Sequence, residues 1–142
     1  QAEENDDLFR NEVKQLIYKN FPHLNYAPIV FVSALNGYRI HQIFPLIERA
    51  KIERQTEIDS EELNKFLNKI LKQKLPARGK GTRHPKILGL KQINSAPPIF
   101  EMFIKSNTSV HSSYVHFVAN RLREQFSFFA APIIIKLTKI KR

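Results

Sequence analysis

The stretch that most constrains the fold is NRLREQFSFFAAPIIIKL, residues 120–137. Apolar residues leading into it recur at the three-and-four spacing of one helical face: Tyr114, Phe117, Val118, Leu122 and Phe126. This spacing predicts a helix that ends near Ser127. Pro132 then precedes three isoleucines, whose β-branched side chains favour an extended chain that we expect to be buried. A helix leading directly into an apolar strand is half of an α/β layer, so other segments must complete the sheet.

Residues 59–142 supply the other elements of such a sheet. Asp59 or Ser60 is expected to cap a helix, and two strands are predicted at 86–92 and 98–105 with a short turn between them. The apolar face of that helix comprises Leu63, Phe66, Leu67, Ile70 and Leu71. The order α-β-β-α-β predicts an α/β (α+β) domain with a three-stranded sheet, both helices on one face and a right-handed crossover before the last strand.

The first part of the chain, residues 1–53, has a different pattern. It predicts a helix at 6–20, a buried apolar strand at 29–32 and a second helix at 38–51. One strand leaves both of its edges unpaired, so this part cannot form a sheet by itself. Residues 54–58 are predicted to be a linker. Because the sequence does not start with Met, we expect it to be a piece of a longer chain.

Charge divides the chain in the same place. Residues 1–58 contain 7 Lys/Arg and 8 Asp/Glu, whereas residues 59–142 contain 16 and 5. The second part is therefore strongly basic, which indicates attraction to a polyanion, nucleic acid before an anionic membrane. No apolar run approaches the roughly 20 residues of a membrane span. The absence of cysteine excludes disulfides and thiolate metal sites and fits a cytoplasmic protein.

The basic residues give the candidate RNA-binding site. Residues 76–86, PARGKGTRHPK, contain five basic residues, two glycines and no acid, so the backbone could approach a phosphate chain. The alternative is an ordinary solvated basic loop. The candidate RNA-contacting residues are Arg78, Lys80, Arg83 and Lys86, with Lys65, Lys69, Lys72, Arg123, Lys139, Lys141 and Arg142. G-K-G-T is not the G-x-x-G loop of a KH domain, so we predict no standard KH groove.

The sequence predicts neither catalytic nor metal-ligating residues. Its five histidines lack zinc spacing, and Glu101 and Glu124 are expected to be surface or ion-paired carboxylates. Arg121 and Arg123 lie two apart on a helix and must point in different directions, so at least one is expected to be structural, with Arg121 favoured. The phenylalanines at 126, 128 and 129 are predicted to belong to the core.

A set of distinctive residues lies at the strand starts, the turn and the second helix of the basic part: Lys86-Ile87, Gln92, Pro97-Pro98-x-Phe100, Ser113-Tyr114, Asn120-Arg121-Leu122-Arg123-Glu124-x-Phe126 and Pro132-Ile133. With these residues, 59–142 resembles the C-terminal KH-like domain of the EngA/Der family, the bacterial tandem GTPases of ribosome assembly. The resemblance implies docking on the large ribosomal subunit.

Residues 1–53 are similar to the end of that family's second P-loop GTPase domain. The stretch Ala27-Pro28-Ile29 to Ser33-Ala34-Leu35, followed by Asn36-Gly37, is similar to its guanine-recognition loop, in which the Ala34 amide would approach the guanine carbonyl. Both the phosphate loop G-x-x-x-x-G-K-[ST] and the Asn-Lys-x-Asp element are missing. The resemblance therefore implies GTP and Mg in a full-length protein, but no cofactor and no GTP hydrolysis in this chain alone.

Two functions follow as expectations from this resemblance. In the first, the chain is an RNA-facing module whose partner is ribosomal RNA of the large subunit, and no membrane is involved. In the alternative, it is a protein-interaction module that packs on the remaining GTPase domains of the same protein and relays their nucleotide state. The dependence of binding on salt concentration distinguishes the two functions, because phosphate contacts weaken steeply with ionic strength and apolar contacts do not.

Overall fold

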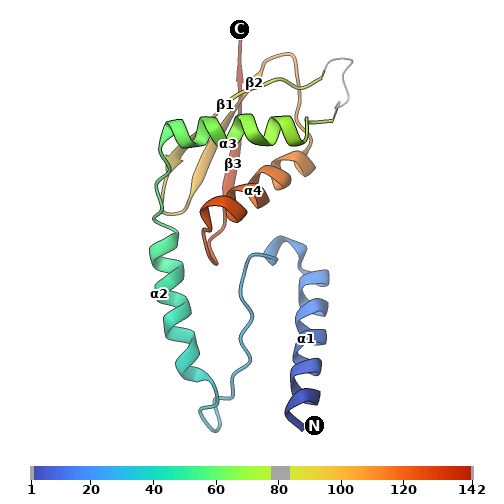
Figure 1. Ribbon diagram of the computed structural model, residues 1–142, viewed down its shortest axis with the longest axis vertical. Helices are drawn as coiled ribbons and strands as arrows, with labels where there is room; N and C mark the ends of the chain where they lie inside the picture. Colours follow the sequence, from blue (N-terminus) through green and yellow to red (C-terminus); the bar gives the residue numbers. More distant parts are fainter. Residues whose placement is uncertain (1, 78–83, 142) are drawn as a thin grey trace.

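The computed structural model describes residues 2–77 and 84–141 of the chain (Figure 1). Its elements follow the order α1 (Ala2–Asn20), α2 (Ile43–Glu53), α3 (Ser60–Gln73), β1 (Ile87–Asn94), β2 (Ile99–Lys105), α4 (Ser112–Phe126) and β3 (Ile134–Ile140). Short 3-10 turns follow α1 and precede α2. None of the helices within the described residues is both long and apolar enough to cross a membrane.

The C-terminal part is the α-β-β-α-β unit that the sequence predicts. Its sheet has the order β1-β2-β3, with β1 antiparallel and β3 parallel to the central strand β2. A parallel pair needs a crossover connection, and α4 provides it. Figure 1 shows α3 and α4 together on one face of the sheet, as expected from the apolar faces of the two helices.

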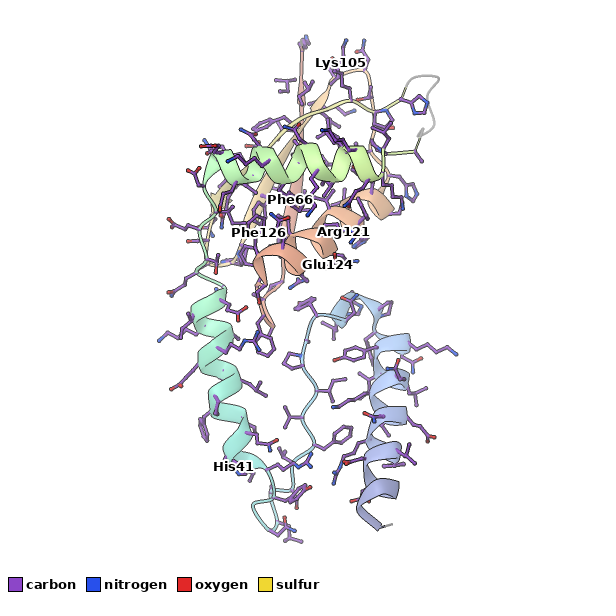
Figure 2. The ribbon with its side chains drawn as sticks, in the orientation of Figure 1. His41, Phe66, Lys105, Arg121, Glu124 and Phe126 are labelled. Carbon is purple, nitrogen blue, oxygen red and sulfur yellow. The ribbon has the colours of Figure 1, made fainter. Side chains whose placement is uncertain are left out.

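The core lies between that face and the two helices. In β2 alternate residues are buried, and in α3 the buried residues lie on one side of the helix, so both periodicities point to the same layer. Phe66 of α3 and Phe126 of α4 meet edge to face with ring centroids 5.8 Å apart (Figure 2). Fully buried residues in this core include Phe66, Phe100, Met102, Ile104, Val118, Leu122 and Phe128.

The helix ends follow the sequence signals. Asp59 is the N-cap of α3, and its carboxylate accepts a hydrogen bond of 3.0 Å from the Glu61 backbone N–H. Pro45 is the third residue of α2, in the first turn, where proline removes no intrahelical hydrogen bond. The helix predicted at 38–51 therefore begins later, at Ile43, and ends two residues later, at Glu53.

The prediction of a strand at 29–32 is wrong for this chain. Residues 28–32 have no regular secondary structure and no ladder partners among the described residues, and the nearest pairing is an isolated bridge between Ser33 and Tyr38. A strand needs a neighbour for its N–H and C=O groups, and no other segment of this part supplies one. Instead α1 covers the segment: the Tyr18 hydroxyl donates to the Ala27 carbonyl at 2.8 Å, and Lys14 lies 5.9 Å from the Phe31 ring centroid.

The isoleucine strand is also less buried than its sequence indicates. β3 is an edge strand, and only alternate residues face the core: Ile135 packs against it while Ile134 is 41% exposed. The expectation of a fully buried strand fails because a three-stranded sheet covered on one face leaves the other face open.

Candidate functional site

Six of the seven predicted basic residues on the described part of the domain gather in two places, and Arg123 lies apart from both. Lys86, Lys139 and Lys141 are exposed at one end of the sheet, where the Lys105 N–H bonds the Lys86 carbonyl and the Ser106 N–H bonds the Ile140 carbonyl, each at 3.0 Å. We call this set of three lysines the basic end. It lies away from α1 and α2, next to the C-terminus (Figure 1). Arg78, Lys80, Arg83 and Arg142 fall outside the described residues.

The second place is α3, whose Lys65, Lys69 and Lys72 are all exposed. Their spacing of four and three residues puts them on one side of the helix, opposite its buried face. Lys65 forms an ion pair with Glu61 at 2.7 Å, one turn earlier. Such an exposed pair contributes little to stability, about 0.3–0.5 kcal/mol, so the lysine remains available to a stronger anion.

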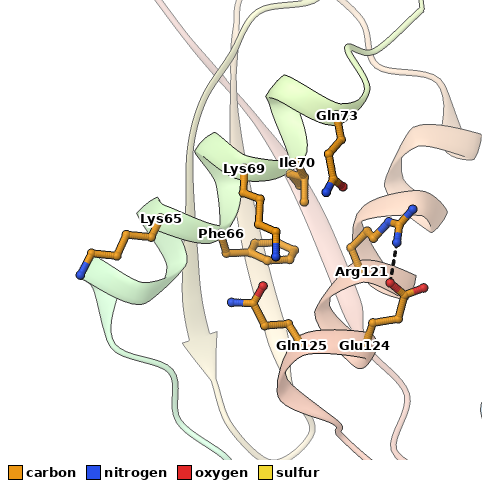
Figure 3. A pocket seen from close by; sticks show the side chains of 8 residues that line it. All are labelled: Lys65, Phe66, Lys69, Ile70, Gln73, Arg121, Glu124 and Gln125. Atoms are coloured by element: carbon orange, nitrogen blue, oxygen red, sulfur yellow. Dashed lines mark hydrogen bonds and ion pairs between the residues drawn. The ribbon is translucent and has the colours of Figure 1, made fainter.

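A groove of about 480 Å³ runs between α3 and α4 (Figure 3). Its floor is Phe66 and Ile70, both nearly completely buried. Lys69 and Gln73 extend toward it from α3, and α4 supplies the facing wall. The full lining consists of Lys65, Phe66, Lys69, Ile70, Gln73, Arg121, Glu124 and Gln125. Polar donors thus surround an apolar floor, an arrangement that suits an anion at the rim rather than a base stacked below.

Arg121 is held in place by its own helix, as the sequence favoured. Its Nη1 donates to Glu124 Oε2 at 2.6 Å, and its guanidinium lies 5.3 Å from the centroid of the Phe117 ring. The side chain is 42% exposed. Because a guanidinium has five N–H donors, the pair with Glu124 leaves several of them directed to solvent or to the groove.

Arg123 points away from this groove, toward the N-terminal part of the chain. Its guanidinium lies 4.0 Å from the Tyr26 ring centroid, and its Nη1 donates to the Phe128 carbonyl at 3.1 Å. Burial lowers the pKa of Arg123, an effect that Tyr26 partly offsets. The expectation that Arg121 and Arg123 diverge is confirmed. Contact of Arg123 with RNA stays a prediction, one that would require these intramolecular contacts to be exchanged.

The loop after α4 makes a second contact with the N-terminal part, through the end of α2. The Glu53 carboxylate accepts hydrogen bonds from the Ser127 hydroxyl and from the Phe129 N–H, the latter at 2.7 Å. Arg49 pairs with Glu53 at 2.7 Å and lies 4.0 Å above the Phe129 ring. Together with Arg123 and Tyr26, these residues form a joint between the two parts of the chain.

The loop similar to a guanine-recognition element, Ser33-Ala34-Leu35, forms a turn closed by the Ser33–Tyr38 bridge. Leu35 is 98% exposed. Within residues 2–77 and 84–141, no group of three or more His, Asp or Glu could hold a metal ion. The turn supplies neither the phosphate loop nor the Asn-Lys-x-Asp element that the sequence lacks.

The sequence missed most of the side chains that build these arrangements. Gln73 and Gln125 line the groove, and Glu53 and Tyr26 belong to the joint. The spacing of 65, 69 and 73 on one helix face was a usable signal for the groove. Apart from its i,i+4 pair with Arg49, Glu53 has partners more than 70 residues further along the chain, which no local pattern identifies.

Comparison with known proteins assigns the C-terminal domain to a family. The model of the KH-domain-like region at the C-terminus of EngA bacterial GTPase enzymes matches residues 57–138, more than half of the chain. The chain belongs to the EngA/Der family. The match covers α3, β1, β2, α4 and β3 as far as Thr138, and hence the groove, but only Lys86 of the basic end.

Family members align over nearly the whole chain. It is 35% identical over 124 residues to the GTPase Der of Chloroflexus aggregans, covering 87% of this chain and 28% of that protein. It is 32% identical over 136 residues to the GTPase Der of Caldanaerobacter subterraneus subsp. tengcongensis, covering 96% and 31%. The GTPase Der of a Geobacillus species is 33% identical, covering 94% and 30%. The chain thus spans about three tenths of the length of these EngA/Der relatives.

Proposed function

We propose that this chain is the ribosome-binding, RNA-facing part of an EngA/Der-like GTPase and acts on the large ribosomal subunit during its maturation in the cytoplasm. In this proposal, GTP and its magnesium ion are bound by the GTPase domains of the longer protein. The division of the chain into 1–53, 54–58 and 59–142 belongs to the same proposal, with the first part packing on those domains.

The basic end carries this proposal. Lys86 precedes β1, whereas Lys139 and Lys141 lie at the end of β3, so residues distant in sequence present one sign of charge at one end of the sheet. The joint with the N-terminal part lies at the other end of the domain (Figure 1). The lysines are therefore exposed to a polyanion while the opposite end remains attached to the GTPase portion.

The test compares two triple variants of equal charge. Lys86, Lys139 and Lys141 are changed together to Gln, and the matched control changes Lys19, Lys51 and Arg54, which are exposed in the acidic part. Binding to purified large ribosomal subunits is measured by filter retention over a series of salt concentrations. We expect the first variant to bind more weakly and its log–log salt slope to fall by about one unit for each lost phosphate contact. The control should bind like the wild type.

The loop residues are tested in the same assay. Changing Arg78, Lys80 and Arg83 together to Ala should weaken binding at low salt while leaving the circular dichroism spectrum unchanged. If neither this variant nor the Lys86–Lys139–Lys141 variant weakens binding, RNA contact by these residues is wrong.

The joint favours a second function, relay of nucleotide state. Glu53, Arg49 and Arg123 connect α2 and the N-terminal segment to the loop after α4. If the GTPase portion moves α2 when its nucleotide changes, these contacts would carry the movement to the KH-like domain. This function predicts that ribosomal-subunit binding depends on the bound nucleotide in the full-length protein, and that Glu53→Gln reduces that dependence.

A further inference from the structure

The groove between α3 and α4 has the features of a phosphate site. Lys69 is exposed and makes no ion pair within the described residues, so its ammonium is available to a ligand. Arg121 uses one nitrogen for Glu124 and keeps further donors. The carboxamides of Gln73 and Gln125 can each donate two N–H groups. Donors from both helices therefore surround one opening (Figure 3).

We propose that this groove binds a backbone phosphate of RNA through four side chains: Lys69, Gln73, Arg121 and Gln125. The proposal rests on the RNA-facing function above and names a binding site for it on the helical face, separate from the basic end. It also gives Arg121 a role beyond a structural one.

The floor of the groove indicates whether the groove would contact an RNA base or the phosphate backbone. Phe66 has 1% of its surface exposed and Ile70 has 2%, so neither presents a face on which a base could stack. The available contacts are charged and amide donors at the rim, which recognise phosphate oxygens regardless of sequence. The site is expected to position RNA without selecting among bases.

Glu124 has a positioning role in this site. Its carboxylate accepts a hydrogen bond of 2.6 Å from the Arg121 guanidinium, which also lies 5.3 Å from the Phe117 ring centroid, so less side-chain entropy is lost when a phosphate binds. The balance of Lys65, Lys69 and Arg121 against Glu124 remains positive.

The decisive experiment changes charges inside and outside the groove. Lys69→Gln combined with Arg121→Gln is compared with Lys19→Gln combined with Lys51→Gln, which removes two exposed lysines of the N-terminal part, outside the groove lining. The probe is a fluorescein-labelled single-stranded RNA of mixed sequence, titrated with the full chain at low salt. We expect the groove variant to bind about tenfold more weakly or worse, and its salt slope to fall by about one unit, whereas the control with Lys19→Gln and Lys51→Gln changes affinity by less than about twofold.

Two results would overturn the groove as the site. If the control with Lys19→Gln and Lys51→Gln weakens binding as much as the groove variant, the effect is general electrostatic attraction. If the groove variant binds RNA like the wild type, the groove is not occupied. Thermal unfolding of each variant, expected within a few degrees of the wild type because every changed side chain is at least partly exposed, separates these results from loss of folding.

A second measurement separates the groove from the proposed function. Inorganic phosphate is titrated into the full chain, and the side-chain amide signals of its glutamines are followed by NMR. Shifts confined to Gln73 and Gln125, absent for exposed Gln15 and Gln55, support the phosphate site even if RNA and ribosomal subunits fail to bind. Absence of those shifts overturns the site, and so does a shift with polyglutamate but not with phosphate, because the occupant is then an acidic protein.

Discussion

The loop after α4 has an unusual backbone conformation that is held by contacts with neighbouring residues. Ser127 has φ 70° and ψ −85°, and the Phe128 N–H bonds the Phe126 carbonyl at 3.2 Å, which is a γ-turn of the rare, strained kind. Phe128 and Ala130 also have positive φ. Such non-glycine conformations cost of order 1–3 kcal/mol each and persist only where neighbours enforce them. Glu53 and Arg123 are those neighbours, because they bond three successive residues of the turn.

Glu53 is therefore expected to matter for stability through its charge. Burial raises the pKa of its carboxyl, but hydrogen bonds from Ser127, Arg49 and Phe129 together lower the pKa by more than burial raises it. The pKa of Glu53 therefore lies below its ordinary value. Replacement by Gln keeps the size and removes the charge. Glu53→Gln should lower the free energy of unfolding at neutral pH by about 1–2 kcal/mol, measured by urea denaturation.

The pH dependence follows from the direction of that shift. A carboxyl with a lowered pKa stabilises the folded state fully above its ordinary pKa of 4.5 and loses this contribution as the pH falls through the folded value. The difference between the wild type and Glu53→Gln should therefore be constant near neutrality and shrink as the pH drops below about 4. A difference that grows on acidification would show that the carboxylate is not stabilised in this way.

Among the elements, α3 is positioned by a side chain of β1 that bonds residues 54–58, the segment before the helix. The Gln92 carboxamide of β1 accepts from the Ile58 N–H and donates to the Thr56 carbonyl, both at 2.8 Å. The amide group thus acts as a short piece of neighbouring strand and satisfies two backbone groups of residues 54–58. This bond sets where α3 begins relative to the sheet, and with it the position of the α3–α4 groove.

The edge strand β3 offers a direct test of the sheet. Ile135 packs against the core and Ile134 faces the open side, although the two are adjacent and identical in type. Ile135→Lys should destabilise the domain by about 2–4 kcal/mol because it places an ammonium in the core, whereas Ile134→Lys should change stability by less than about 1 kcal/mol. Urea unfolding of both variants checks this, and equal losses would contradict the register of β3.

On the scale of the whole molecule, the chain is two unequal parts. All residues of the core cluster lie between positions 58 and 128, and none comes from α1 or α2. The N-terminal part instead leaves large apolar side chains exposed, among them Leu8, Phe9, Leu16, Phe44, Ile47 and Ile52. Exposed apolar surface of this kind is typical of interaction sites and of regions that associate.

A truncation tests this division. A chain that starts at residue 54 keeps the core cluster and the Gln92 contacts, so it should unfold in one cooperative thermal transition and remain monomeric in sedimentation velocity. The full chain should associate as its concentration rises, because its exposed apolar residues cover one another. A full chain that stays monomeric at high concentration would contradict this expectation.

The amino-acid sequence by itself determined the secondary structure and order of the C-terminal domain. Helical spacing, the Asp59 cap and the alternation in β2 are local signals, and each depends on residues within a few positions of one another. The basic character of this half and the family resemblance are equally properties of the sequence. They predicted an RNA-facing α-β-β-α-β unit before any contact was known.

The tertiary structure alone decided which side chains form sites. The groove joins residues of α3 to residues of α4 about 50 positions away, and the joint brings Glu53 to the turn at 127–129. The tertiary structure also decided that residues 29–32 form no ladder, since an apolar run becomes a strand only where another strand accepts its hydrogen bonds. Local propensity specifies what a segment can become, and only long-range packing selects its partners.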